Sequence, residues 1–155
     1  MAEASLIELA RTSDDEQWVV ALWIMQLKEI FPTNEGYVVV PNYRVSPGRQ
    51  LRADVGLLTL EIQSGINQPL ILIECKSSAR HGEWWAHDYQ LGNYFAASGC
   101  NRGILAIGSQ CKFNWIDEHG HHQQTAETHD WNVDPGPIVD ELEHFRKNHH
   151  RFTFF

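Results

Sequence analysis

The run from Leu70 to Lys76 (Leu-Ile-Leu-Ile-Glu-Cys-Lys) constrains the fold more than any other part of the chain. Its four consecutive branched apolar residues predict a strand that is buried on both faces at the centre of a sheet. The strand nevertheless ends in Glu74 and Lys76. These side chains share one face, about 7 Å apart, and buried charge is stable only when it is paired or binds a metal. With Asp54, twenty residues before Glu74, they predict a functional site.

A hard divalent cation, Mg²⁺ or Mn²⁺, is the ligand that this site predicts. Such ions take oxygen ligands, and in enzymes they are often held by one or two carboxylates beside substrate phosphates. Simpler interpretations stay open at this point. Asp54 could cap the turn at residues 46–52, and Glu74 with Lys76 could form a structural ion pair.

The whole chain, residues 1–155, predicts a single α/β domain. A short helix is expected to open at Ser5 and a longer one to run from Ser13 to about Phe31, with apolar residues at helical spacing. Pro41 indicates an edge strand or a bulge. The expected order is α-β-β-β-α-β-(β)-α, around a central mixed sheet of four to five strands. The strands are expected at 37–45, 51–62, 70–77, 102–108 and 112–116, and the later helices at 83–97 and 138–148.

Three motifs fall in this order: Asp54 on the second strand, Glu74-Cys75-Lys76 on the third, and Gln90-x-x-x-Tyr94 in the helix that follows. Together they resemble the PD-(D/E)xK nuclease superfamily, which has a restriction-endonuclease-like core. The Q-x-x-x-Y element is similar to that of RecB- and Cas4-like nucleases and to related elements of type I restriction subunits. The resemblance covers roughly residues 13–110, and Ala53 stands where the motif has proline.

This resemblance implies a metal-dependent nuclease that hydrolyses phosphodiester bonds, more readily in DNA than in RNA. Asp54 and Glu74 would share Mg²⁺ or Mn²⁺, with the backbone carbonyl of Cys75 as a further ligand. The metal would polarise the phosphate and lower the pKa of a bound water. Lys76 would orient that water or stabilise the charge of the transition state.

Further residues are candidates for substrate contact. Gln90 and Tyr94 share one helical face; Gln90 would position a phosphate or a metal-bound water, and Tyr94 would contact the nucleic-acid backbone or stack on a base. Arg52 and Arg80 would contact phosphates. Weaker candidates of the same kind are Arg44, Arg49, His87 and one of the adjacent Trp84 and Trp85, where an exposed ring could stack on bases.

Many members of the superfamily add a glutamate from the first helix, and Glu16 is the better candidate for that metal ligand. Glu16 and Glu8 each also fit the S-x-x-E capping box, in which the glutamate bonds back to the N-terminal N–H of the helix. We expect Glu8 to be a cap, and Glu16 to be either a cap or part of the site.

The formal net charge of −8, from 12 basic and 20 acidic residues, argues against a protein that coats nucleic acid nonspecifically. It leaves a nuclease possible, because metal ions neutralise site charge. One alternative is a binding or scaffold protein that keeps the nuclease fold without turnover. Another is a zinc-binding interaction module in the polar segment 117–134, which is expected to be a loop with some extended structure. Its ligands would come from His119, His121, His122, His129, Asp117 and Asp130, whose spacing matches no standard zinc site.

The three cysteines show no C-x-x-C spacing and are odd in number, which predicts reduced thiols in an intracellular protein, cytoplasmic or nuclear rather than secreted. The first residues lack the features of a signal peptide. No apolar run reaches the ~20 residues that span a membrane, so no membrane partner is expected. A homodimer is possible, since a single site of this type often cuts two strands by pairing with a second subunit.

Overall fold

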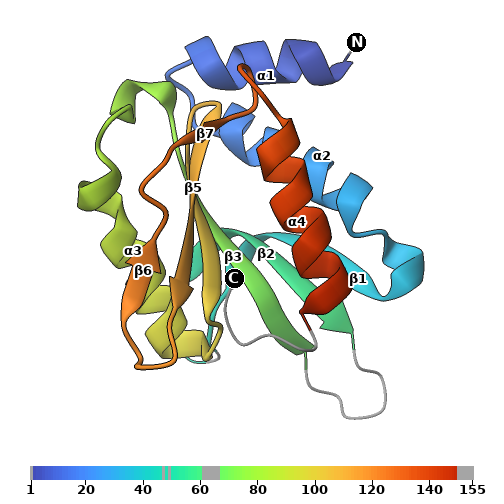
Figure 1. Cartoon of the computed structure of the whole chain (residues 1–155), viewed down its shortest axis with the longest axis vertical. Coiled ribbons are helices and arrows are strands. Elements are labelled where there is room, and N and C mark those ends of the chain that lie inside the picture. Colours follow the sequence, from blue (N-terminus) through green and yellow to red (C-terminus); the bar gives the residue numbers. More distant parts are fainter. Residues whose placement is uncertain (1, 47, 49, 61–66, 150–155) are drawn as a thin grey trace.

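The computed structural model describes residues 2–46, 48, 50–60 and 67–149, and within them four α-helices surround one mixed sheet (Figure 1). None of the helices found there is long and apolar enough to cross a membrane. The helices are α1 (Ala2–Thr12), α2 (Gln17–Ile30), α3 (Trp84–Ser98) and α4 (Gly136–Asn148), with short 3₁₀ turns η1 (Thr33–Glu35) and η2 (Ser78–Arg80). The strands are β1 (Tyr37–Arg44), β2 (Arg52–Leu60), β3 (Asn67–Lys76), β4 (Arg102–Ile107), β5 (Gln110–Ile116), β6 (His122–Gln124) and β7 (His129–Asp130).

The sheet has the order β1-β2-β3-β4-β5-β6, and β7 also pairs with β5. Strands β3 and β4 are parallel and the other neighbours are antiparallel. The α/β class is confirmed, but the expectation of four to five strands is wrong, because the described residues already form a sheet of seven. The two strands beyond the expected count, β6 and β7, are three and two residues long and lie in segment 117–134, where some extended structure was expected. Their polar sequences carry no apolar alternation, because they join β5 through backbone pairing and through side-chain hydrogen bonds such as those of His122 and Gln124 to Asn114.

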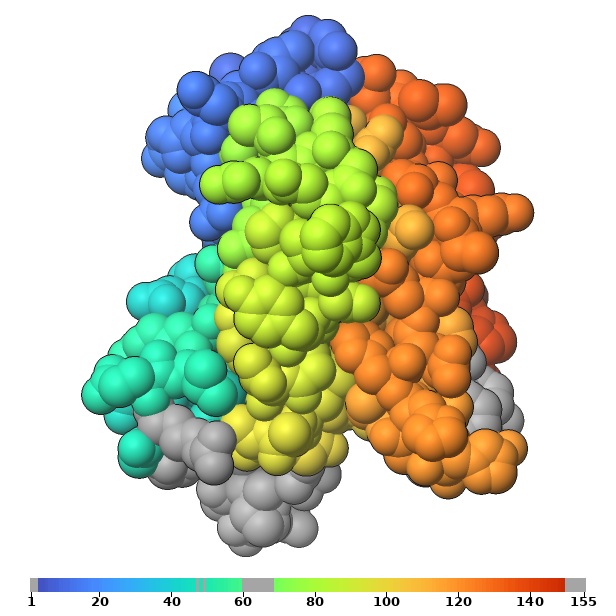
Figure 2. Space-filling model, turned by 90° about the vertical axis from the view of Figure 1, so that its left-hand side faces the viewer, coloured from blue at the N-terminus to red at the C-terminus, as the bar shows by residue number. Residues whose placement is uncertain are grey.

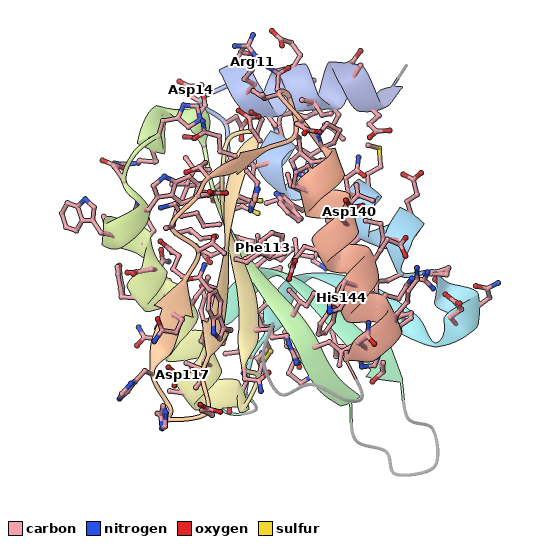
Figure 3. All side chains as sticks on the ribbon, viewed as in Figure 1. Arg11, Asp14, Phe113, Asp117, Asp140 and His144 are labelled. Carbon is pink, nitrogen blue, oxygen red and sulfur yellow. The ribbon has the colours of Figure 1, made fainter. Side chains whose placement is uncertain are left out.

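The helices form two layers, one on each face of the sheet (Figure 1). Helices α1, α2 and α4 cover one face with the larger apolar core, in which Phe113 of β5 lies on the α4 side (Figure 3). Helix α3 covers the other face, where Leu91 and Phe95 pack against Leu72 and Leu105. The central strand β3 is therefore buried on both faces, as its apolar run predicts.

Gly103 lets α3 lie close to the sheet. A Cβ at this position would come within 2.9 Å of the Phe95 ring and 3.0 Å of a Leu91 methyl group, which is closer than such atoms pack. The crossover from β3 through α3 to the parallel strand β4 depends on this contact.

Two buried tryptophans join distant parts of the chain on the opposite face. The rings of Trp23 in α2 and Trp131, just after β7, meet edge to face with their centroids 5.4 Å apart. Both side chains are almost completely buried. The segment that the sequence presents as a loop thus supplies a core residue.

The N-terminal helices differ in detail from the prediction. Helix α1 begins at Ala2 rather than Ser5, and Glu8 pairs with Arg11 one turn later instead of capping the helix. The expected edge position of the Pro41 strand is confirmed, since β1 is the first strand in the sheet order. Helix α4 begins two residues before the expected Ile138, at Gly136.

Candidate active site

The site begins where β2 and β3 stop pairing. Their antiparallel register runs to Val55 opposite Ile73 and goes no further toward the carboxyl end of β3. Beyond that point the Cys75 backbone N–H donates to the Asp54 carboxylate, with 2.7 Å between the nitrogen and Oδ2. A side chain thus takes the place of a ladder hydrogen bond, and the two strands separate around it.

Glu74 is the most deeply buried charged group of the site, with 4% of its surface exposed. Its two oxygens have different partners. Oε1 lies 3.0 Å from the Lys76 ammonium nitrogen, and Oε2 accepts a hydrogen bond from the Tyr94 hydroxyl at 2.7 Å. Burial and the neighbouring carboxylate raise the pKa of Tyr94, which keeps its phenol protonated as a donor. Glu74 is held from both sides.

Asp54 is the carboxyl group of the site whose pKa is raised most clearly. Burial raises its pKa from 3.8 to about 7, and the nearby charge of Glu74 adds to the increase, although the Cys75 N–H opposes it. Partial burial disfavours the charge of Lys76, but the carboxylates around it outweigh this effect and raise the pKa of the amine. The single ammonium group of Lys76 therefore lies among three carboxyl groups, those of Glu74, Glu16 and Asp54, and the site has more acidic than basic side chains.

Glu16 belongs to the same electrostatic neighbourhood. Desolvation by the surrounding protein raises the pKa of its carboxyl group, with Lys76 lowering it and Glu74 raising it. No hydrogen bond from the Glu16 side chain caps α2, while Asp15 accepts the hydrogen bond of the Gln17 N–H. The cap interpretation of Glu16 is wrong, and its role as a metal ligand stays a prediction. The Ser78 hydroxyl donates to the Ser13 carbonyl at 2.7 Å and so ties η2 to the segment between α1 and α2.

The carbonyl of Cys75 faces the opening between the strands. The N–H and C=O of one strand residue point to the same edge of the strand, and the Cys75 N–H points to Asp54. The backbone groups of the next residue point the opposite way, toward β4, since the Lys76 carbonyl accepts a hydrogen bond from the Gly108 N–H. The Cys75 thiol is buried, and burial raises its pKa.

One face of α3 borders this opening. His87, Gln90 and Tyr94 are spaced three, four and seven residues apart, so they lie along one helical face, which Tyr94 anchors on Glu74. His87 lies 3.4 Å from Glu83 one turn before it. Gln90 is half-buried between His87 and Tyr94. The Tyr94 ring is only 5% exposed, so in this structure it orients Glu74 and offers no face to a base.

The candidate arginines lie outside the carboxylate cluster. Arg80 is exposed and makes a loose ion pair with Glu83 at 3.7 Å. Arg52 is exposed on β2 opposite Arg44 of β1, and it donates to the Asn42 carbonyl at 3.0 Å. Arg49 lies outside the described residues.

The donor set suits a hard divalent cation. Asp54, Glu74 and the Cys75 carbonyl supply oxygen atoms, and burial, followed by the nearby charge of Glu74, raises the pKa of Asp54. Within the described part of the chain, no three or more His, Cys, Asp and Glu side chains gather closely enough to hold a metal. Two carboxylates with a carbonyl nevertheless match how Mg²⁺ is usually bound, with water and substrate phosphates completing its shell.

The histidine-rich segment is not arranged as a zinc site. His122 shares a hydrogen bond of 2.8 Å with Asn114, and Asp117 accepts hydrogen bonds from the N–H groups of His119 and His121. Asp130 accepts from Ser109. These polar groups stabilise the turn between β5 and β6 and the pairing of β5 with β6 and β7. Among the described residues no cluster of three or more His, Cys, Asp and Glu side chains supports the zinc interpretation.

Comparison with known proteins supports the fold of the chain. No family model and no curated protein matches the chain. The structure is similar to a chain in the cryo-EM structure of a DrdV–DNA complex, with a TM-score of 0.56 and 15% sequence identity. The likeness covers 97% of this chain and 99% of that chain. A protein of the same fold has thus been solved in complex with DNA.

The sequence pattern singled out Asp54, Glu74 and Lys76, but it did not predict the hydrogen bonds that hold these side chains. The hydrogen bond from Tyr94 to Glu74 and the bond from the Cys75 N–H to Asp54 were not expected. The spacing of Gln90 and Tyr94 shows that they share a face, but it does not show which group that face meets.

Proposed function

We propose that the chain is a Mg²⁺- or Mn²⁺-dependent nuclease that hydrolyses phosphodiester bonds in DNA. The observation that carries the proposal is the arrangement of Asp54, Glu74 and Lys76 at the point where β2 and β3 separate. It is supported by the similarity of the fold to a chain of a DNA complex.

Each residue of the candidate site has its own role in the proposed reaction. Asp54, Glu74 and the Cys75 carbonyl would hold the cation, which when bound polarises the phosphate and lowers the pKa of a water. Tyr94 keeps Glu74 in place. Lys76 carries the positive charge that faces the phosphate as negative charge develops on it. Gln90, on the same helical face as Tyr94, would donate to a phosphate oxygen.

The test is a cleavage assay on circular, linear and single-stranded DNA, with Mg²⁺, with Mn²⁺ and with EDTA. Cleavage should require the metal and fall at least 100-fold in Glu74→Gln and Lys76→Met, since removal of a single preorganised electrostatic group commonly costs that much. Asp140→Asn and Lys147→Met are the matched controls, because both residues are exposed on α4. Circular dichroism shows whether each variant is folded. Full activity in a folded Glu74→Gln variant would refute the proposal.

A second function, binding without turnover, is favoured by one observation. Both Glu74 oxygens already have protein partners, Lys76 and Tyr94, so a metal would compete with them. Titration with Mn²⁺, followed by its electron paramagnetic resonance signal, separates the two functions. Binding that Asp54→Asn abolishes supports the nuclease, and no binding at millimolar Mn²⁺ with DNA present supports the scaffold.

A further inference from the structure

The hairpin formed by β1 and β2 differs in charge from the rest of the chain. Residues 36–53 contain three arginines and no acidic residue, while the other residues contain nine basic and all 20 acidic residues. Two of these arginines, Arg44 and Arg52, are exposed in the described part of the hairpin. A basic surface on an otherwise acidic molecule favours a polyanionic partner, because it attracts locally what the remaining surface repels.

Arg44 and Arg52 lie directly opposite each other across the hairpin. Their Cα atoms are partners in the β1–β2 register, and like charges in such positions destabilise a sheet. Within the parts of the chain that the structure describes, neither makes an ion pair with a carboxylate. Arg11, Arg80 and Arg146 each do. The two opposed guanidinium groups thus lack a counter-charge that phosphate groups would supply.

The backbone near Asp54 holds Arg52 in a defined direction. One guanidinium nitrogen of Arg52 donates to the Asn42 carbonyl at 3.0 Å. Asn42 has a positive φ of 51°, which is uncommon outside glycine, and the register places it opposite Asp54. Backbone conformations of this kind often lie at functional sites. A guanidinium group has five N–H donors, so the bond to Asn42 leaves most of them for a ligand.

The arginine pair lies next to the candidate site. Arg52 and Asp54 are two residues apart on β2, so their side chains share a face, about 7 Å apart along the strand. Figure 2 shows the β1–β2 segments against α3, on the same side of the molecule as the α1–α2 segments, with a recess between the two. A nucleic-acid strand with one phosphate at Asp54 would therefore bring a neighbouring phosphate to the pair.

The planar fork of an arginine donates two parallel hydrogen bonds to phosphate oxygens, which a point charge does not. We propose that Arg44 and Arg52 form a clamp for the phosphodiester backbone of a nucleic acid, and that this clamp holds the phosphate next to the one that is cleaved. Arg80 is paired with Glu83 and is not part of the clamp. The cleavage part of this inference rests on the proposed nuclease function, whereas the binding part does not.

The binding test uses the intact protein in EDTA, titrated against a fluorescein-labelled (dT)12 oligonucleotide and followed by fluorescence anisotropy at several salt concentrations. Arg44→Gln/Arg52→Gln should bind (dT)12 at least about tenfold more weakly, and its salt slope should be shallower by about 1.4, or about 0.7 for each lost phosphate contact. Arg44→Lys/Arg52→Lys keeps the charge without the fork and should bind with intermediate affinity.

Arg11→Gln/Lys147→Gln is the matched control. It removes the same charge from exposed positions on α1 and α4 and should change the affinity by about twofold at most, because distant surface charges are screened by salt. Circular dichroism shows whether each variant is folded. Arg44→Gln alone gives the same test with half of the slope change, should loss of the bond from Arg52 to Asn42 disturb the hairpin.

The outcomes separate the two proposals. If Arg44→Gln/Arg52→Gln binds (dT)12 as tightly as the native chain, the clamp is refuted. It is also refuted if the control variant loses as much affinity, because net charge alone would then explain the effect, or if the arginines bind phosphatidylserine vesicles and not DNA. Metal-dependent cleavage with an unchanged KM in the double glutamine variant refutes the clamp and keeps the nuclease. Arginine-dependent (dT)12 binding without cleavage under any metal keeps the clamp and refutes the nuclease.

Discussion

At the scale of one residue, Asp54 places a partly buried carboxylate where a hydrophobic core would have an apolar side chain. Its carboxylate accepts the Cys75 N–H, which a strand partner would otherwise bond, and it lies among other acidic groups. This arrangement costs stability, because the charge of Asp54 is partly desolvated and repelled. Sites often carry such a cost in return for the chemistry they perform.

The sign of this cost predicts a pH dependence. The pKa of Asp54 is about 7 in the folded chain against an ordinary 3.8, so the folded state holds the proton more tightly and stability falls as pH rises through that window. The difference corresponds to at most about 4 kcal/mol at 1.36 kcal/mol per unit. Asp54→Asn keeps an oxygen for the Cys75 N–H and should therefore raise the free energy of unfolding at pH 8 but hardly at pH 4.

Urea denaturation at the two pH values in EDTA measures this effect. Asp140→Asn, on the exposed surface of α4 (Figure 3), is the control and should change stability equally little at both. The same increment for Asp54→Asn at pH 4 and pH 8 would contradict the expected repulsion.

At the scale of elements, α3 connects the fold to the site. One side of it packs on β4 over Gly103, and another places Tyr94 against Glu74. Gly103→Ala should lower the free energy of unfolding by about 1–3 kcal/mol, because the added methyl overlaps with Phe95 and Leu91. It should also weaken activity by displacing Tyr94.

Gly92→Ala on α3 is the matched control. Its Cβ would meet the His122 ring at 3.4 Å, an ordinary contact, and alanine in a helix interior is favoured over glycine by about 0.5–1 kcal/mol. Thermal unfolding should rank Gly92→Ala above the native chain and Gly103→Ala below it. The reverse order would show that α3 is free to move away from β4.

Some elements can be predicted from the sequence better than others. The dense apolar run of β3 and the helical spacing of apolar residues in α2 predicted both elements, because a strand buried on both faces and a helix buried along one face each require a characteristic pattern of apolar residues. Strands β6 and β7 leave none, since their pairing uses backbone groups that every residue has. The E-x-K spacing located Glu74 and Lys76, but the capping-box pattern gave the wrong role to Glu8, whose partner is Arg11. Local patterns do not show which of two nearby partners a carboxylate meets.

At the scale of the whole molecule, the formal charge of −8 limits how tightly the chain could hold DNA under the proposed function. Affinity that depends on many phosphate contacts is lost steeply with salt, with a slope of about −0.7 per contact for single strands. Because the exposed cations near the candidate site are few, we expect a slope no steeper than about −2 to −3 for (dT)12. Fluorescence titrations at several salt concentrations measure it. A slope near −7 would indicate an extended basic track, which the described surface does not have.

The meeting of Trp23 with Trp131 has a consequence for how the chain acquires its structure. Residues more than a hundred positions apart complete one core, together with apolar residues of α4. During synthesis, the apolar faces of α1 and α2 therefore emerge long before the residues that bury them. Contacts of such long sequence separation slow folding, and the N-terminal helices remain open to chaperones, or to aggregation, until the last quarter of the chain has been made.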